Sequence, residues 1–162
     1  MKHLLSFLLM CLSTWAAAQI TEVRINEVDP DQPGIDTTEF VELYGPANQP
    51  LDGLILIFIT GASDVSYDVY DLAGFSTDES GFFVLGAPSV LNVDMLLIPN
   101  PQGSIENGAD AIVLYEGSAA DWPEGTAANA DFAIDAIVYG TENAEDAGLI
   151  MLFAQGKHNW MT

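Results

Sequence analysis

The chain has 162 residues, and its 24 aspartates and glutamates are opposed by only three lysines and arginines, which leaves a formal net charge of −21. A surface this acidic repels nucleic acid and anionic membranes, so we expect neither as a direct partner. The length suits one domain that can bury a single core. Because Cys11 is the one cysteine, no internal disulfide can form.

The N-terminus has the layout of a secretory leader. Lys2 and His3 precede an apolar run from Leu4 to Leu12, and alanines follow at positions 16–18. The apolar run has about half the length that a membrane-spanning helix requires. We therefore predict a signal peptide over residues 1–18 and an exported chain, secreted, periplasmic or on the cell surface, with no membrane insertion after cleavage. A retained membrane anchor is the alternative.

Short apolar segments follow the predicted leader, separated by Gly, Pro, Asn and Asp about every dozen residues, which is typical of an all-β sandwich or barrel. The continuous apolar segment 54–59 predicts a central strand covered on both faces, whereas the mixed segment 40–44 suits a strand near the rim. The predicted strands are 22–28, 39–44, 54–60, 66–72, 81–85, 94–98, 111–115 and 134–139, with a ninth over Leu149 to Phe153.

The connections carry three further local predictions. Residues 116–131, rich in Ala, Gly and Asp, are predicted to form a long surface loop. Asn107 and Gly108 favour a tight turn, since both residue types tolerate a positive φ, before an apolar strand that begins at Ala111. Asn26 and Glu27 interrupt an apolar strand, so we expect their side chains to bond to neighbouring backbone where strands part.

Several segments, taken in chain order, resemble one known family. Residues 24–28 read Arg-Ile-Asn-Glu-Val, residues 39–44 read Glu-Phe-Val-Glu-Leu-Tyr, and residues 51–54 read Leu-Asp-Gly-Leu. With the later segments 81–86, 107–115 and 134–140, this order resembles the lamin tail domain, in particular its bacterial secreted members.

The resemblance implies an immunoglobulin-like β-sandwich of about eight or nine strands, which agrees with the strand pattern. We place this domain at residues 19–154 and a short C-terminal tail at 155–162.

Four carboxylates, those of Asp29, Asp31, Asp36 and Glu39, lie in or beside the loop between the first two predicted strands. Hard oxygen ligands of this kind suit calcium. The loop begins like a helix-loop-helix calcium loop, with acids at positions one and three and Gly34 at position six, but its second half does not match. One interpretation is therefore a calcium site formed by these four residues, and the other is a solvated, proline-stiffened turn.

The sequence holds no recognisable catalytic motif. It lacks a G-x-S-x-G elbow, an H-E-x-x-H pair and a Gly-rich phosphate loop. His158 is the one histidine after the predicted leader, and it stands near the C-terminus. Paired carboxylates can perform glycoside hydrolysis, but among 24 acids a suitable pair arises by chance. We predict no enzymatic activity, no catalytic residues and, calcium apart, no cofactor.

The predicted function is a non-catalytic extracellular binding, adhesion or structural module of lamin-tail type. Its loops or exposed strand edges would contact a protein or polysaccharide outside the cell. The family resemblance implies one alternative, an accessory domain that forms the leading, truncated part of a secreted nuclease or phosphoesterase. A calcium-stabilised surface module is the other alternative.

Overall fold

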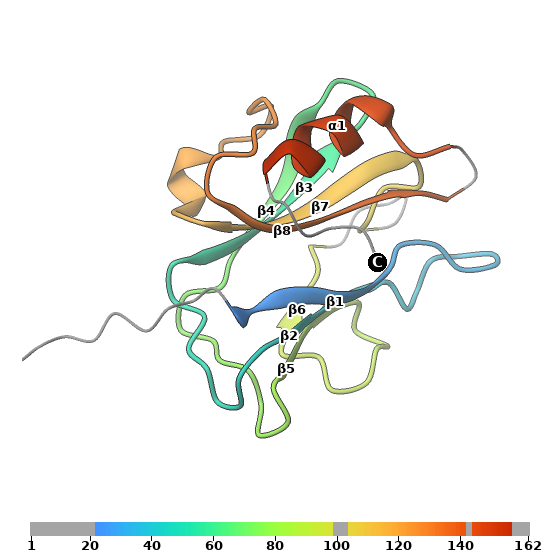
Figure 1. The fold of residues 1–162 in the computed structure, drawn as a ribbon. Helices are drawn as coiled ribbons and strands as arrows, with labels where there is room; N and C mark the ends of the chain where they lie inside the picture. The colour runs from blue at the N-terminus through green and yellow to red at the C-terminus, as the bar shows by residue number, and fades with distance from the viewer. Residues whose placement is uncertain (1–21, 99–103, 142–143, 157–162) are drawn as a thin grey trace, which may run out of the picture.

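The computed structural model describes residues 22–98, 104–141 and 144–156. Its strands form two four-stranded sheets (Figure 1), which confirms the all-β prediction. The first sheet has the order β1-β2-β5-β6 and the second the order β4-β3-β7-β8; all neighbours are antiparallel except β5 and β6. The strands are β1 (Arg24–Asp29), β2 (Phe40–Tyr44), β3 (Leu54–Thr60), β4 (Val65–Asp71), β5 (Phe82–Gly86), β6 (Met95–Leu96), β7 (Ala109–Glu116) and β8 (Ala133–Gly140).

Strand β3 shows how one apolar segment serves two cores. Successive side chains of a strand point to opposite faces of its sheet. The even-numbered residues Leu54, Leu56 and Phe58 therefore join the core between the two sheets, while Ile55, Ile57 and Ile59 join a second core on the other face. All six side chains are fully buried, which confirms the prediction of a central strand covered on both sides.

The core between the sheets is built from the inward residues of both. From the first sheet, β2 and β5 supply buried aliphatic and aromatic side chains, and β7 supplies their counterparts in the second sheet. The rings of Phe58 and Tyr70 have centroids 5.1 Å apart and add an aromatic contact. The inward residues of these three strands are Val41, Leu43, Phe83, Leu85, Ile112 and Leu114.

The helix α1 (Ala147–Gly156) covers the outer face of the second sheet, so that the molecule has three layers (Figure 1). Leu149 and Phe153 of the helix pack on Ala111, Val113 and other outward residues of that sheet. Apolar side chains on this face are thereby removed from water, at a gain of about 25 cal/mol per Å² of apolar surface buried.

The prediction of a ninth strand over residues 149–153 is wrong, because this segment lies in α1. Leu149 and Phe153, four residues apart, are buried on one helix face, while Ile150 and Met151 are exposed. The carboxylate of Asp146 accepts a hydrogen bond from the Leu149 amide (2.8 Å) and so caps the helix. A five-residue apolar run fits strand and helix equally well, and only packing on the second sheet decides between them.

The prediction that residues 40–44 form a strand near the rim is also wrong. Strand β2 lies inside the first sheet, with β1 on one side and β5 on the other. Its mixed composition has a different cause: Val41 and Leu43 face the core, whereas Phe40, Glu42 and Tyr44 lie on the half-buried outer face. No helix covers that face in Figure 1, so the strand alternates instead of being apolar throughout.

Two predicted elements differ from the structure at their boundaries. The strand expected over residues 94–98 is the two-residue strand β6, which pairs in parallel with β5. The chain bends at Asn107 and Gly108, but neither residue has a positive φ, and β7 begins at Ala109 instead of Ala111. Asn107 instead donates a side-chain hydrogen bond to Asp36 (2.9 Å), which holds two loops together.

Asn26 lies at a β-bulge, where the register between β1 and β2 shifts between Ile25 and Glu27. Its side-chain amide donates to the carboxylate of Glu42 on β2 (2.7 Å) rather than to the backbone, which corrects our expectation for this residue. Both residues at the bulge, Asn26 and Glu27, are exposed.

Within the described residues, no helix is long and apolar enough to span a bilayer. The predicted leader over residues 1–18 lies outside the described residues. Helix α1 runs to Gly156, two residues beyond the predicted domain boundary at 154.

Candidate functional site

Three of the four residues of the predicted calcium site lie near one another: burial raises the pKa of Glu39, and the charges of Asp36 and Asp29 add to this increase. Glu39 is 1% exposed, and its carboxylate accepts hydrogen bonds from the amides of Ser104 (2.7 Å) and Ile105 (3.0 Å). Asp31 is exposed, whereas Asp29, the last residue of β1, is half-buried. The bonds of Glu39 hold the 104–105 segment against the start of β2, which is a structural role.

The carboxylate of Asp36 is used within the fold in the same way. It accepts hydrogen bonds from the backbone amide of Gln32 (3.0 Å) and from the side chain of Asn107 (2.9 Å). In the described part of the chain, no group of three or more His, Cys, Asp or Glu residues is placed to hold a metal ion. The calcium site therefore stays a prediction from the sequence.

Many acidic side chains of this protein accept hydrogen bonds from backbone amides. Some of these bonds are local, such as that from the amide of Ala73 to Asp71 (2.9 Å), and others join distant segments, such as that from the amide of Ile25 to Asp135 (2.7 Å). A charged acceptor makes a stronger bond than a neutral one. The other residues used in this way are Asp36, Glu39, Asp52, Asp78, Asp94, Asp110 and Asp146.

Three partly or fully buried carboxylates have a raised pKa, because burial disfavours their charged form. Burial and then the charges of Glu124 and Glu106 raise the pKa of Asp68 to about 6. Burial also raises the pKa of Glu39 and of Asp110, against the opposing effect of their backbone hydrogen bonds. These groups therefore favour folding most when they are protonated.

We predict that the domain is more thermally stable at pH 5 than at pH 7.5. A folded pKa raised above the unfolded value of about 4 gives a stability contribution that is complete below that value and is lost as pH rises through the folded pKa. For Asp68 this loss falls between about pH 4 and pH 6, the latter being its folded pKa. Thermal unfolding followed by circular dichroism checks this, and Asp68→Asn should raise Tm at pH 7.5 and flatten the pH profile. A higher Tm at pH 7.5 for the unaltered chain would contradict the prediction.

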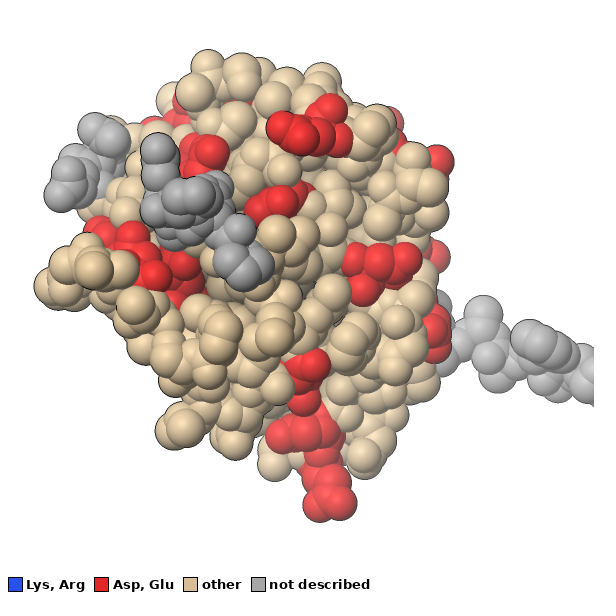
Figure 2. Space-filling view, turned by 180° about the vertical axis from the view of Figure 1, so that it is seen from behind, with Lys and Arg blue, Asp and Glu red and all other residues tan. Residues whose placement is uncertain are grey.

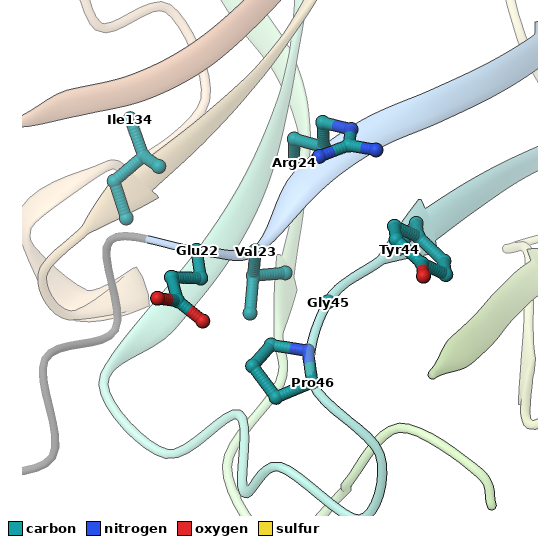
Figure 3. Close-up of a pocket in the computed structure, with 7 residues that line it drawn as sticks. All are labelled: Glu22, Val23, Arg24, Tyr44, Gly45, Pro46 and Ile134. Atoms are coloured by element: carbon teal, nitrogen blue, oxygen red, sulfur yellow. The ribbon is translucent and has the colours of Figure 1, made fainter. Parts of the chain in front are cut away.

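Two surface clefts remain as candidate binding sites, and the smaller one has a volume of about 490 Å³. In Figure 3, Arg24 on β1 and Tyr44 at the end of β2 lie on one side of this cleft, with Ile134 of β8 on the other. The guanidinium carbon of Arg24 lies 4.9 Å from the centroid of the Tyr44 ring, so the charge is already stacked on an aromatic face. Glu22 also lines the cleft and offsets the charge of Arg24.

The larger cleft, about 620 Å³, has a size typical of small-molecule and side-chain sites. It lies where the end of β7 meets the 116–132 segment, which contains the short helix η2 (Ala119–Asp121). Its lining combines three aromatic rings with carboxylates, hydroxyls and an amide. The residues that line it are Tyr115, Glu116, Gly117, Ser118, Asp121, Trp122, Thr126, Asn129, Asp131 and Phe132.

The cleft is held in shape by contacts of the loop with the second sheet. The rings of Tyr115 and Trp122 have centroids 4.6 Å apart, and the Tyr115 hydroxyl donates to the carbonyl of Asn129. The backbone of Thr126 accepts a hydrogen bond from the amide of Ser66 at the start of β4 (2.8 Å). These contacts fix the loop at Trp122, Thr126 and Asn129, so the cleft is largely preformed.

Phe132 stands out among the residues of this cleft. Its side chain is 78% exposed, and its φ is 62°, in the left-handed region that bulky side chains rarely adopt. Such strain costs about 1–3 kcal/mol, and burial of the ring does not offset it. The amide of Ala133 donates a hydrogen bond to the carbonyl of Ala130 (3.3 Å), so Phe132 lies in the turn that leads into β8, with its ring at the edge of the cleft.

The cleft is also acidic, with Glu116, Asp121 and Asp131 around its aromatic residues. Burial raises the pKa of the Tyr115 hydroxyl, and the charge of Asp131 adds to this increase. The negative charge of Asp131 is therefore felt at the aromatic residues of the cleft. Figure 2 shows carboxylates spread over one face of the molecule and no basic side chain in that view. In the described part of the chain, the one lysine or arginine is Arg24, which lines the other cleft.

The residues of this cleft were not singled out from the sequence, which predicted only a long surface loop over residues 116–131. Trp122 could have indicated this site, because a large aromatic side chain in a loop rich in Ala, Gly and Asp is expected to pack against the rest of the domain. It is buried against the second sheet, with 9% of its side chain exposed. The strain at Phe132 could not be read from the sequence.

Comparison with models of known protein families gave no match to this chain, and a search of curated proteins gave none either.

Proposed function

We propose that this chain is a non-catalytic extracellular binding module of lamin-tail type, exported by the leader over residues 1–18, with an immunoglobulin-like sandwich as its scaffold. The single observation that carries the binding function is the preformed cleft of Tyr115, Trp122 and Phe132, with an exposed, strained aromatic ring at its edge. The two-sheet architecture and the order of motifs that resembles the lamin tail domain support the family and scaffold.

The site favours binding over chemistry. Its aromatic rings offer apolar faces, and its carboxylates and hydroxyls offer hydrogen bonds that orient a ligand. The partner fitting this site is a protein or polysaccharide outside the cell that presents a side chain or ring to the cleft.

We predict that Phe132→Asn lowers ligand affinity about tenfold while leaving the fold intact or slightly more stable. Asparagine adopts a positive φ more readily than phenylalanine, and the exposed ring contributes little to burial. The chain from Gln19 onward, with Trp160→Phe so that Trp122 is its one tryptophan, reports binding by fluorescence. Titrations use cello-oligosaccharides, N-acetylglucosamine oligomers and capped tripeptides, followed by a thermal melt of each variant.

Leu91→Asn is the matched control, because Leu91 is 84% exposed but does not line the cleft. It should leave both affinity and Tm unchanged. The affinity of each binding probe is compared between Phe132→Asn and the unaltered chain. If no probe binds the variant more weakly, the cleft is not the binding site and this proposal fails.

A further inference from the structure

The cleft of Tyr115, Trp122 and Phe132 also indicates which chemical class of partner it accepts, an inference that rests on the proposed binding function. We propose that it takes a cationic side chain, arginine in particular, presented by an extended segment of a protein partner. Charge, aromatic surface and shape support this choice separately.

The charge of the lining excludes anions. Glu116, Asp121 and Asp131 line the cleft, and no described lysine or arginine lies among its lining residues. The rest of the molecule has the same sign, with a formal net charge of −21. A positively charged partner is therefore attracted at long range and meets three carboxylates on arrival.

The aromatic lining attracts the same class of ligand. The face of an aromatic ring carries negative charge density, and it attracts a cation that lies within about 6 Å of the ring centroid. The exposed ring of Phe132 offers such a face at the edge of the cleft. The stacking of Arg24 on Tyr44 in the smaller cleft shows this same contact within the protein itself.

Shape favours arginine over lysine. A guanidinium group is planar, so it can stack on a ring while its N–H groups bond to a carboxylate in two parallel contacts. A ring at the edge and carboxylates nearby, as with Phe132 and Asp131, provide both kinds of contact. The volume of about 620 Å³ admits an arginine side chain together with part of its peptide backbone.

The test compares three capped peptides, Gly-Arg-Gly, Gly-Lys-Gly and Gly-Gln-Gly, by titration of Trp122 fluorescence in the Trp160→Phe chain at low salt. We expect the arginine peptide to bind tightest, the lysine peptide about threefold more weakly and the glutamine peptide not measurably. Added salt should weaken binding of both cationic peptides, because exposed charges are screened.

A charge-matched pair of variants separates local contact from general attraction. Asp131→Asn and Glu124→Gln each remove one negative charge from the same loop, but only Asp131 lines the cleft, while Glu124 is exposed outside it. We expect Asp131→Asn to weaken the arginine peptide about threefold to tenfold and Glu124→Gln to change its affinity less than twofold.

Equal effects of the two variants, or equal binding of the arginine and glutamine peptides, would overturn the inference. If a neutral oligosaccharide binds in a Phe132-dependent way while the peptides do not, the cationic ligand class is wrong and the proposed binding function stands. If Phe132→Asn leaves the affinity for every probe unchanged, the binding function of the cleft is wrong as well.

Discussion

Gly81→Ala should destabilise the fold by at least about 3 kcal/mol, because it adds a methyl group where both the backbone conformation and the available space require glycine. Gly81 has a φ of +92°, and a Cβ at this position would stand 2.2 Å from the carbonyl oxygen of Gly45. The obstacle is backbone, tied to Gly81 itself by a hydrogen bond from the Gly45 amide (2.9 Å), so it cannot move without opening the junction between β2 and β5. Urea unfolding followed by tryptophan fluorescence measures the loss.

Gly74→Ala separates the two causes of this effect. Gly74 has nearly the same backbone conformation, with a φ of +84°, but nothing lies within 4 Å of its hypothetical Cβ. It should therefore show the conformational cost alone, about 1–2 kcal/mol. Equal losses for the two variants would mean that the close approach to Gly45 has no energetic weight.

Asp135→Ala should cost about 2–4 kcal/mol, because it leaves the amide of Ile25 buried without its acceptor. The bond of 2.7 Å joins residues 110 positions apart, with Ile25 on the edge strand of the first sheet and Asp135 on the edge strand of the second. Asp135 is 2% exposed and Ile25 is 6% exposed, so water cannot replace the carboxylate. The bond thus satisfies an edge amide and closes one side of the sandwich.

Urea unfolding and amide hydrogen exchange measure this second effect. Asp135→Ala should lower the unfolding free energy and speed exchange at Ile25 above the global change. Asp71→Ala is the control, since its bond to the amide of Ala73 is exposed and spans two residues, and should cost less than about 1 kcal/mol. A loss no greater in Asp135→Ala than in Asp71→Ala would show that the cross-sheet bond is not important for stability.

The sequence predicted most strand positions because the side chains themselves carry that information. The segment 54–60 has no polar member before Thr60, and its bounds match those of β3, since such a run between turn residues suits a strand that is buried on both faces. The strands over 24–29, 65–71, 82–86 and 133–140 also lie within one or two residues of their predicted bounds, because turn residues limit them on both sides.

The elements that the sequence misassigned depend on partners far away in the chain. Residues 149–153 are helical because Leu149 and Phe153 meet the outer face of the second sheet, and Asp146 caps the first turn. Likewise, β2 lies inside its sheet because β5 pairs with it across 38 or more residues. Neither the packing of α1 on the second sheet nor the pairing of β2 with β5 leaves a pattern in the local sequence. The apolar residues that stabilise these contacts belong to other segments of the chain.

For the candidate site too, some features follow from the sequence and others from the tertiary structure alone. By itself the sequence determined that the protein is strongly acidic, that it is built from short strands and that residues 116–131 form a long loop. Only the tertiary structure decided that Tyr115 of β7 and Trp122 of this loop stack, that Phe132 takes a positive φ and that the three carboxylates lie around them. Composition is a property of the chain, whereas a cleft arises where packing of the second sheet brings separate residues together, and local preferences do not encode that geometry.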